Sequence, residues 1–585
     1  MDILVPALVC LPFGLAAAVL ARADLARSEP PVGWLGLVAS GGFALIWSLE
    51  TTTRFSAFPA GGIFPLALDA TMFSGLIAEL GDWRMVGRMS SSLADVPTDL
   101  YHFASFGFAA LAVRLGLEPM QAMPRVWVAL GPLFISVGLH LLGRTLAGPA
   151  AGIVAVLLLV VLPEPASYGL AQPFLSFHWM SEVSPGAAYA IGAICVSFSL
   201  LALWCRERGY RLLAASAAMM ALGFLLRAHL VLWAAAPWAA VAVAGWPGLR
   251  PLLRAVLLLL GALVLAGGLV FAGRAEVAQV GFGQYAGGFL LLVGTVFVPN
   301  GYMGVSTWLV AHLGLGGSAL PLALIALGAM GGAPLLTFLM GAVLLRRRLS
   351  AIDVLPFALL AWAAALMILA PTPFHGDSSE FRQRGFLLVV VILIAWNARW
   401  VLLGLPALAA RGAALGLAAC AGLLVTWLCV ADWKAPRTAY FQQFRATPVS
   451  AAMVEGGAWL RAHAVPGGSF VVDRQNLETI AADDGTLLSA FSGLPAWISR
   501  AALHLKREGA AATEARHRLD VLAEMAAAPD AAAAMSLLCR EGVSFYVVTG
   551  DAPSWDPERR AAAFRAEGLS IWPTGTDRPC ARPRG

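Results

Sequence analysis

The sequence predicts a polytopic α-helical membrane protein that ends in an α/β domain outside the membrane. Of its 585 residues, 59% are hydrophobic and only 12% are charged, and the mean hydropathy is +0.77. Apolar runs of about 20 residues, enough for a helix to cross a bilayer core, recur along the first three quarters of the chain. From Asp432 onward the composition changes, because the last 154 positions hold 34 of the 73 Asp, Glu, Lys and Arg residues. We therefore expect a membrane domain over 1–431 and a soluble domain over 432–585.

The apolar runs predict about 12 transmembrane helices. The candidate spans are 3–22, 33–50, 124–144, 149–165, 185–204, 211–227, 229–246, 252–272, 319–345, 352–370, 385–404 and 408–430. Segment 286–312 is apolar enough to hold a re-entrant piece or an extra pair. The first run lacks a preceding basic segment and a small-residue cleavage pattern, so we interpret it as a retained span.

Arginine placement predicts the orientation of these spans, because short cytoplasmic loops are enriched in Lys and Arg. With the N-terminus outside, the inner connections hold 13 arginines and the short outer connections hold 4. Both termini are then extracytoplasmic. The same choice places the loop 51–123, the loop 166–184, the loop 371–384 and the C-terminal domain on one side. The net charge of +5 is explained by these loop arginines, and nucleic acid is not a predicted partner.

Short strands and helices are predicted for the C-terminal domain. Residues 469–473 and 543–550 are rich in Val and aromatic residues, which is typical of buried strands. Residues 497–528 and 556–567 are expected to be helical. Alternating strands and helices favour a small α/β domain.

Seven cysteines are present, and five lie in or beside apolar runs as small hydrophobic residues. Cys539 and Cys580 lie in the polar tail, where they can form a disulfide if the tail faces an oxidising compartment. Two cysteines alone do not decide this, and both alternatives stay open.

The loop 51–123 is unusual among its apolar neighbours because it is rich in acidic residues. It carries Asp69, Glu79, Asp82, Asp95, Asp99 and His102. Residues 70–80 have helical spacing of apolar side chains and are expected to lie at the membrane interface. An acid at Asp69 can accept a proton from an acceptor hydroxyl, although a helix-capping role fits its position equally well. The Tyr101-His102-Phe103 sequence begins an apolar helix too short to span.

These features resemble the GT-C glycosyltransferases. The resemblance covers roughly 55–235: an acid early in the first large outer loop, an amphipathic stretch, a Tyr-His-Phe helix, and an Arg-led span pair joined by LGRTLAGPAAG. Proteins of this family move a sugar from a polyprenyl-phosphate donor to an acceptor on the outer face of the membrane. The resemblance therefore implies a polyprenyl-phosphate sugar donor and a glycan, lipid or protein acceptor, with hexosyl or pentosyl transfer at the bacterial cytoplasmic membrane.

The resemblance places Asp69 where the family has its catalytic acid. The family often has two adjacent acids there, whereas Ala70 follows Asp69 in this chain. Asp95 or Asp99 then replaces the second acid, or no metal is used; a divalent metal ion remains one alternative, and no metal-ligating residues are identified.

The remaining candidate substrate-binding residues come from outer loops and span ends. They are Asp95, Asp99, Tyr101, His102, His178, Trp179, Glu182, Arg227, Arg382 and Arg384. Trp179 is either a membrane-interface anchor or a surface on which a sugar stacks. Arg227 needs a partner inside a span, either a lipid phosphate or the carboxylate of Glu182 or Asp69. Arg382 and Arg384 either bind a phosphate through bidentate hydrogen bonds or form a local salt bridge.

We therefore predict a membrane glycosyltransferase of cell-envelope assembly. The alternative is a non-enzymatic protein of that assembly, either a lipid or polysaccharide transporter or a binding-only scaffold. A transporter predicts charged residues along a path through the spans, whereas here the polar groups gather on one face.

Overall fold

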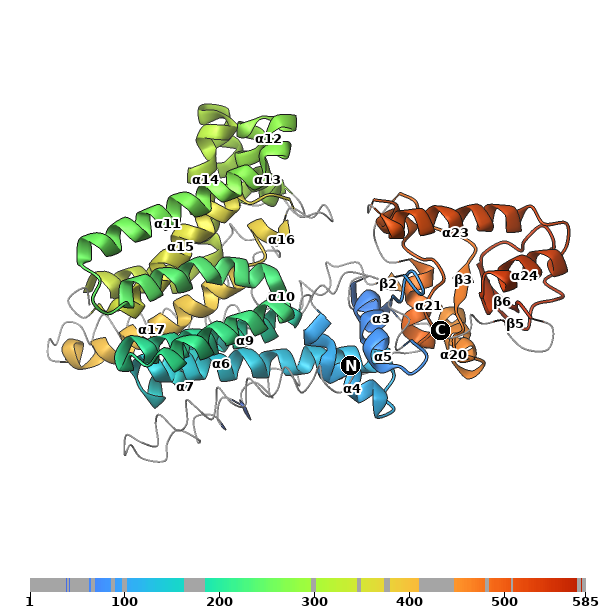
Figure 1. Ribbon diagram of the computed structural model, residues 1–585, viewed down its shortest axis with the longest axis horizontal. Helices are drawn as coiled ribbons and strands as arrows, with labels where there is room; N and C mark the ends of the chain where they lie inside the picture. The colour runs from blue at the N-terminus through green and yellow to red at the C-terminus, as the bar shows by residue number, and fades with distance from the viewer. Residues whose placement is uncertain are drawn as a thin grey trace. The chain divides into compact units, whose positions relative to one another are not determined.

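A computed structural model (Figure 1) describes residues 38, 41–42, 63–64, 69–85, 90–96, 103–161, 185–295, 301–344, 349–372, 379–409, 447–478, 483–506, 509–575 and 580. By its internal contacts the chain forms two compact units. The membrane unit takes its described residues from Leu8–Glu50 and Leu130–Tyr440. The loop–tail unit takes them from Thr51–Ala129 and Phe441–Gly585. The acidic loop, which the sequence groups with the membrane domain, thus shares a unit with the C-terminal domain.

Helices make up the membrane unit. They are α6 (Ala129–Ala147), α7 (Pro149–Val161), α9 (Pro185–Glu207), α10 (Tyr210–Gly245), α11 (Pro251–Ala272), α12 (Arg274–Val280), α13 (Phe282–Thr295), α14 (Gly301–Leu344), η6 (Ala351–Asp353), α15 (Val354–Leu369), α16 (Ser379–Arg382) and α17 (Phe386–Ala409). Seven helical stretches within the described residues are long and apolar enough to cross a membrane. The predicted class, a polytopic helical membrane protein with a C-terminal α/β region, is confirmed. The predicted spans 3–22, 33–50 and most of 408–430 lie outside the described residues.

Two predicted spans, 211–227 and 229–246, form the two arms of α10. The helix breaks at Arg227, whose backbone is extended (φ −163°, ψ 94°). The arms fold back on each other, because Trp238 Nε1 donates to Ser216 Oγ at 2.8 Å across the break. The predicted span 319–345 is interrupted instead, at Gly332 (φ 45°) within α14, where Pro334 follows.

Close helix packing explains the glycines of the first described helices. A Cβ on Gly138 of α6 would lie 2.6 Å from the carbonyl oxygen of Gly192 in α9. Only glycine permits this approach, as at many helix crossings in membranes. In the apolar stretch of α9 that is able to span the membrane, 94% of the residues are buried, whereas in that of α11 only 6% are buried. Helix α9 is therefore central to the unit, and α11 is left to face lipid.

Asp353 joins several helices of the membrane unit at one point. Its carboxylate accepts from Trp396 Nε1 at 2.8 Å, Arg399 Nη2 at 3.1 Å and Ser350 N at 2.7 Å. Arg399 also donates to the carbonyl of Leu146 at 2.6 Å. A buried carboxylate is tolerated when its lone pairs are satisfied in this way. This cluster fixes α15 against α17 and the end of α6.

The loop–tail unit contains the predicted α/β region. Its helices are α3 (Asp69–Gly81), η1 (Phe103–Phe106), α4 (Gly107–Arg114), α5 (Pro119–Ala122), η2 (Met123–Val128), α20 (Ala451–Ala462), α21 (Asp484–Ser492), α22 (Ala501–Leu505), α23 (Ala510–Ala526) and α24 (Ala531–Arg540). Its strands are β1 (Ile63–Phe64), β2 (Thr447–Pro448), β3 (Phe470–Val472), β4 (Phe545–Thr549), β5 (Phe564–Ala566) and β6 (Leu569–Pro573).

Four of these strands form one mixed sheet in the order β3-β4-β6-β5. β3 and β4 are the two predicted strands, and they pair in parallel from Phe470↔Phe545 to Val472↔Val547. β6 runs antiparallel to both β4 and β5. A separate ribbon pairs β1 with β2, so it joins the loop to the tail.

Two helix predictions in the tail need correction. The predicted helix 497–528 is divided into α22 and α23 by Gly509, which has φ +81°. The predicted helix 556–567 is wrong, because these residues form a turn followed by β5. The Asp556 carboxylate accepts from Arg560 N, Ala561 N and Trp572 Nε1. These bonds hold the backbone in a turn, and such local competition is why Asp favours turns over helix interiors.

The segment 90–96 of the acidic loop is held within the tail by backbone hydrogen bonds. Ala94 N donates to Ala496 O at 3.0 Å, and Ala496 N donates to Ser91 O at 2.9 Å. The buried Arg518 of α23 donates to Ala94 O at 2.8 Å. Leu93 and Val96 lie in the same hydrophobic core as Trp497. Because the loop and the tail share one core, both lie on the same side of the membrane.

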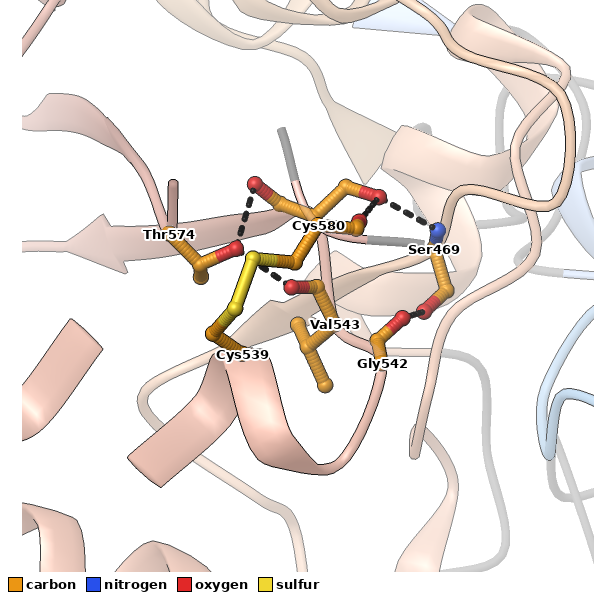
Figure 2. The surroundings of a disulfide bond; sticks show 7 residues. Ser469, Cys539, Gly542, Val543, Thr574 and Cys580 are labelled. Atoms are coloured by element: carbon orange, nitrogen blue, oxygen red, sulfur yellow. Dashed lines mark hydrogen bonds between the residues drawn. A yellow bond between two sulfur atoms is a disulfide. The ribbon is translucent and has the colours of Figure 1, made fainter. Parts of the chain in front are cut away.

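Cys539 and Cys580 form a disulfide at the end of α24 (Figure 2), with their Cα atoms 5.3 Å apart. Thr574 donates to the carbonyl of Val543. Ser544 donates to the carbonyl of Cys580. Disulfides persist in oxidising compartments. The bond therefore supports the prediction that the tail is extracytoplasmic.

We predict that replacing Cys539 by Ser weakens the tail. The bond closes a loop over a sequence separation of 41 residues, and its loss costs about 2–4 kcal/mol through the greater entropy of the unfolded chain. A lower unfolding temperature of the purified protein is the expected result. Reductant must lower that temperature in the wild type and leave Cys539→Ser unchanged; an equal response in both proteins contradicts the assignment.

Candidate functional site

The break in α10 lies within a buried polar cluster of the membrane unit. We call it the helix-break centre and define it as Arg227, His229, Glu380, Arg382 and Arg384. The first four residues are only 1–4% exposed, and Arg384 is half-buried. Ionisable groups inside a membrane domain are costly, and they mark functional sites.

Glu380 of α16 connects the 379–385 turn to the second arm of α10. His229 Nδ1 and Glu380 Oε1 are hydrogen-bonded at 3.2 Å. One helical turn further on, Trp233 Nε1 donates to Phe381 O at 2.8 Å. A Cβ on Gly385 would lie 2.2 Å from the Trp233 ring, so this turn closes only with glycine. The turn is therefore fixed against α10 just after its break.

Arg382 is held by backbone carbonyls. Its Nε donates to Ala370 O at 2.6 Å, and its Nη1 donates to Tyr285 O at 2.8 Å. The guanidinium lies 4.6 Å from the centroid of the Tyr285 ring, within cation–π range. This geometry joins α13, the end of α15 and α16. It favours a positioning role for Arg382. Arg384 Nε donates to Ser379 Oγ at 3.2 Å.

Several ionisable groups lie in or beside the helix-break centre. Among the described residues they are the guanidinium groups of Arg227, Arg382 and Arg384 and the carboxylates of Glu380 and Glu276. Glu276 accepts hydrogen bonds from Thr372 N at 2.7 Å and Thr372 Oγ1 at 2.9 Å. Guanidinium groups form strong charge-assisted hydrogen bonds with anions such as phosphate.

The acidic loop provides the second candidate centre, in the loop–tail unit. Asp69 is the first residue of α3. The predicted helix over 70–80 is thus present. Asp95 occupies a turn with φ +66°, a conformation that Asp tolerates better than most residues. Asp99, Tyr101, His102, His178, Trp179 and Glu182 lie outside the described residues.

Glu79, which the sequence did not single out as a site residue, faces the segment 90–96 from α3. Its carboxylate accepts a hydrogen bond from Ser91 N. Burial raises the pKa of Glu79 from 4.5 to about 7, although Ser91 opposes the shift. Next to it, Ser92 Oγ and His504 Nε2 are hydrogen-bonded at 3.2 Å. Only its place among the acids of the loop marks Glu79 in the sequence.

Among the described residues, no three His, Cys, Asp or Glu side chains come together as metal ligands. The acids of the loop serve other contacts here: Asp82 accepts from Arg84 N at 3.0 Å, and Glu79 accepts from Ser91. The described part of the chain therefore adds no ligand set to the sequence prediction.

Comparisons with known proteins find similarity to solved structures. No family model matches the chain, and no curated protein matches it. Solved structures do: the archaeal oligosaccharyltransferase AglB from Archaeoglobus fulgidus, in complex with an inhibitory peptide and a dolichol-phosphate, shares 12% identity at a TM-score of 0.43. The match covers 88% of this chain and 69% of that one. The apo form of the Archaeoglobus fulgidus oligosaccharyltransferase shares 12% identity at a TM-score of 0.41, covering 87% and 69% of the two chains.

A third match is the same archaeal enzyme with zinc and sulfate, at 13% identity and a TM-score of 0.41, covering 88% of this chain and 68% of that one. These neighbours are oligosaccharyltransferases. The likeness is distant, and we take no donor, acceptor or residue role from it.

We predict that Glu79 makes the loop–tail unit less stable as the pH rises from about 4.5 to about 7. The folded state holds the proton more tightly than the unfolded state in this range, so unfolding releases it and stability falls with pH. The effect reaches about 3 kcal/mol for a fully buried carboxyl, and it is smaller here because Glu79 keeps some contact with solvent.

Unfolding temperatures of wild type and Glu79→Gln at pH 5 and pH 8 measure this effect. Glutamine accepts the Ser91 hydrogen bond without a charge, so the variant gains stability relative to wild type at pH 8 and not at pH 5. Glu524→Gln, on the exposed face of α23, is the control. A difference between Glu79→Gln and wild type that is independent of pH contradicts the prediction.

Proposed function

We propose that this protein is a membrane glycosyltransferase that moves a sugar from a polyprenyl-phosphate donor to an acceptor on the outer face of the cytoplasmic membrane. The observation that carries the proposal is the helix-break centre. It places buried guanidinium groups at the point where α10 reverses. A lipid phosphate is an anion that a protein meets at membrane depth, and charge-assisted bonds from Arg suit it.

The proposal gives each residue a role. Arg227 and Arg384 bind the donor phosphate. Arg382 positions α16 through its bonds to Ala370 and Tyr285, and the His229–Glu380 pair holds the same turn. Asp69 is the base that takes the proton of the acceptor hydroxyl. The new bond forms between the acceptor oxygen and the sugar's anomeric carbon, and the polyprenyl phosphate leaves with the electrons of the broken bond.

The proposal places the chemistry outside the cytoplasm. The loop that carries Asp69 shares a core with the tail, and the tail contains the disulfide. Both support an extracytoplasmic active site, with the loop 51–123 contributing the base. The glycan, lipid or protein nature of the acceptor is left to the assay.

We predict that Asp69→Asn abolishes sugar transfer. The amide keeps the size of the side chain and cannot accept the proton, so transfer falls by at least about a hundredfold, the usual contribution of a general base. Purified wild type and variant are compared with radiolabelled polyprenyl-phosphate sugars. Asp520→Asn, on the exposed side of α23, is the control and retains full activity.

Three results separate the candidate functions. Loss of transfer in Asp69→Asn, with donor binding unchanged, supports the role of Asp69. Equal transfer in wild type and variant removes Asp69 from the mechanism. Absence of transfer with any donor, while wild type still binds polyprenyl phosphate, contradicts the enzyme and supports a binding-only scaffold.

A further inference from the structure

The loop–tail unit contains a polar cavity that none of the residues of the helix-break centre lines. Its volume is about 600 Å³, and it lies between the end of α3, the end of α4 and α20. Three arginines line it: Arg84, Arg114 and Arg461. Trp83, which is 54% exposed, completes this lining. We call it the arginine pocket.

One buried carboxylate fixes two of these arginines. Asp82 is 3% exposed, and its Oδ1 accepts from Arg84 Nη1 at 3.1 Å. Its Oδ2 lies 3.9 Å from Arg461 Nη2. Arg461 Nε also donates to Phe491 O at 3.1 Å. The two side chains are therefore held in place before any ligand arrives, which lowers the entropy cost of binding.

Guanidinium groups are concentrated at the arginine pocket. Asp82 pairs with Arg84 and faces Arg461, and Glu118 also acts on Arg461. Burial lowers the pKa of Arg461, while Asp82 and Glu118 raise it. An additional anion stabilises the charge of a desolvated guanidinium of this kind.

The end of α4 does not offset this charge. A helix C-terminus carries partial negative charge on unpaired carbonyls. Here Leu115 N, Gly116 N and Leu117 N donate to the carbonyls of Leu111, Val113 and Ala112. Gly116 has φ +103°, which closes the turn that satisfies them. The guanidinium groups thus determine the character of the pocket.

Trp83 adds an apolar surface at the same place. The Arg84 guanidinium lies 4.5 Å from the centroid of its ring, so one residue offers charge and its neighbour offers an aromatic face. Pockets that combine an apolar surface with a few placed charged groups bind small molecules. An anion attached to a larger carrier is able to contact the arginines with its charged group and the Trp83 ring with the carrier.

We propose that the arginine pocket binds a phosphate group on a carrier, either a sugar or a lipid, with Arg84, Arg114 and Arg461 on the phosphate and Trp83 against the carrier. This site is additional to the donor site of the proposed function. Its occupant does not depend on Arg227, so the two assignments stand or fall separately.

Calorimetric titration of the full-length protein in a non-ionic detergent tests the proposal. The probes are glucose 1-phosphate, short-chain phosphatidic acid, inorganic phosphate and methyl glucoside. We expect glucose 1-phosphate or phosphatidic acid to bind at least about tenfold more tightly than inorganic phosphate, and methyl glucoside not to bind. The phosphorylated probe that binds more tightly identifies the carrier.

Two exposed positions make the test independent of folding. Arg114 is exposed, and Arg114→Gln is expected to weaken binding about tenfold, the usual effect of losing a charged hydrogen bond. Trp83→Ala reduces the preference for the carrier over inorganic phosphate. Arg516→Gln, an exposed control in α23, leaves binding unchanged. Failure of both phosphorylated probes to bind, or full binding by Arg114→Gln, overturns the proposal.

Discussion

The cost of burying guanidinium groups governs the membrane unit. A charged group in a low-dielectric interior requires opposite charge or several hydrogen bonds. Arg399 meets this requirement through Asp353 and the Leu146 carbonyl, and Arg382 meets it through two carbonyls and an aromatic ring. Arg227 lies at the break in α10, where its extended backbone interrupts the regular helical hydrogen bonding. The reversal of α10 and the docking of the 379–385 turn follow from the same arrangement, and they create the site that we assign to a lipid phosphate.

The second constraint is the core that the acidic loop shares with the tail. Backbone bonds from Ala94 and Ala496 are as integral to this unit as the β3–β4 pairing. Because these parts lie on one side of the membrane, an even number of spans must separate 51–123 from the tail. The ten candidate spans between them satisfy this requirement. Arginine placement and the Cys539–Cys580 bond then both favour the extracytoplasmic side.

Features with a local signal were predictable from the sequence. Helix α3 follows from its apolar spacing, β3 and β4 follow from their Val-rich runs, and Arg227 stands out as a charge between two apolar arms. The His229–Glu380 contact has no such signal, because its partners are 151 positions apart. The serines of 90–92 have the sequence of an ordinary polar loop, and nothing local predicts their hydrogen bonds to the tail. Residues 556–567 were misassigned because the three bonds to the Asp556 carboxylate override a weak helical pattern.

The central claim is that the helix-break centre binds a lipid phosphate, and equilibrium binding of polyprenyl phosphate in nanodiscs tests it most directly. The account predicts that wild type binds polyprenyl phosphate and not the phosphate-free polyprenol. Arg227→Gln and the half-buried Arg384→Gln each weaken binding at least about tenfold, as expected for a lost charged hydrogen bond. Arg211→Gln, an exposed control at the start of α10, keeps wild-type affinity. Equal binding of polyprenol, or undiminished binding by both folded variants, would contradict the account.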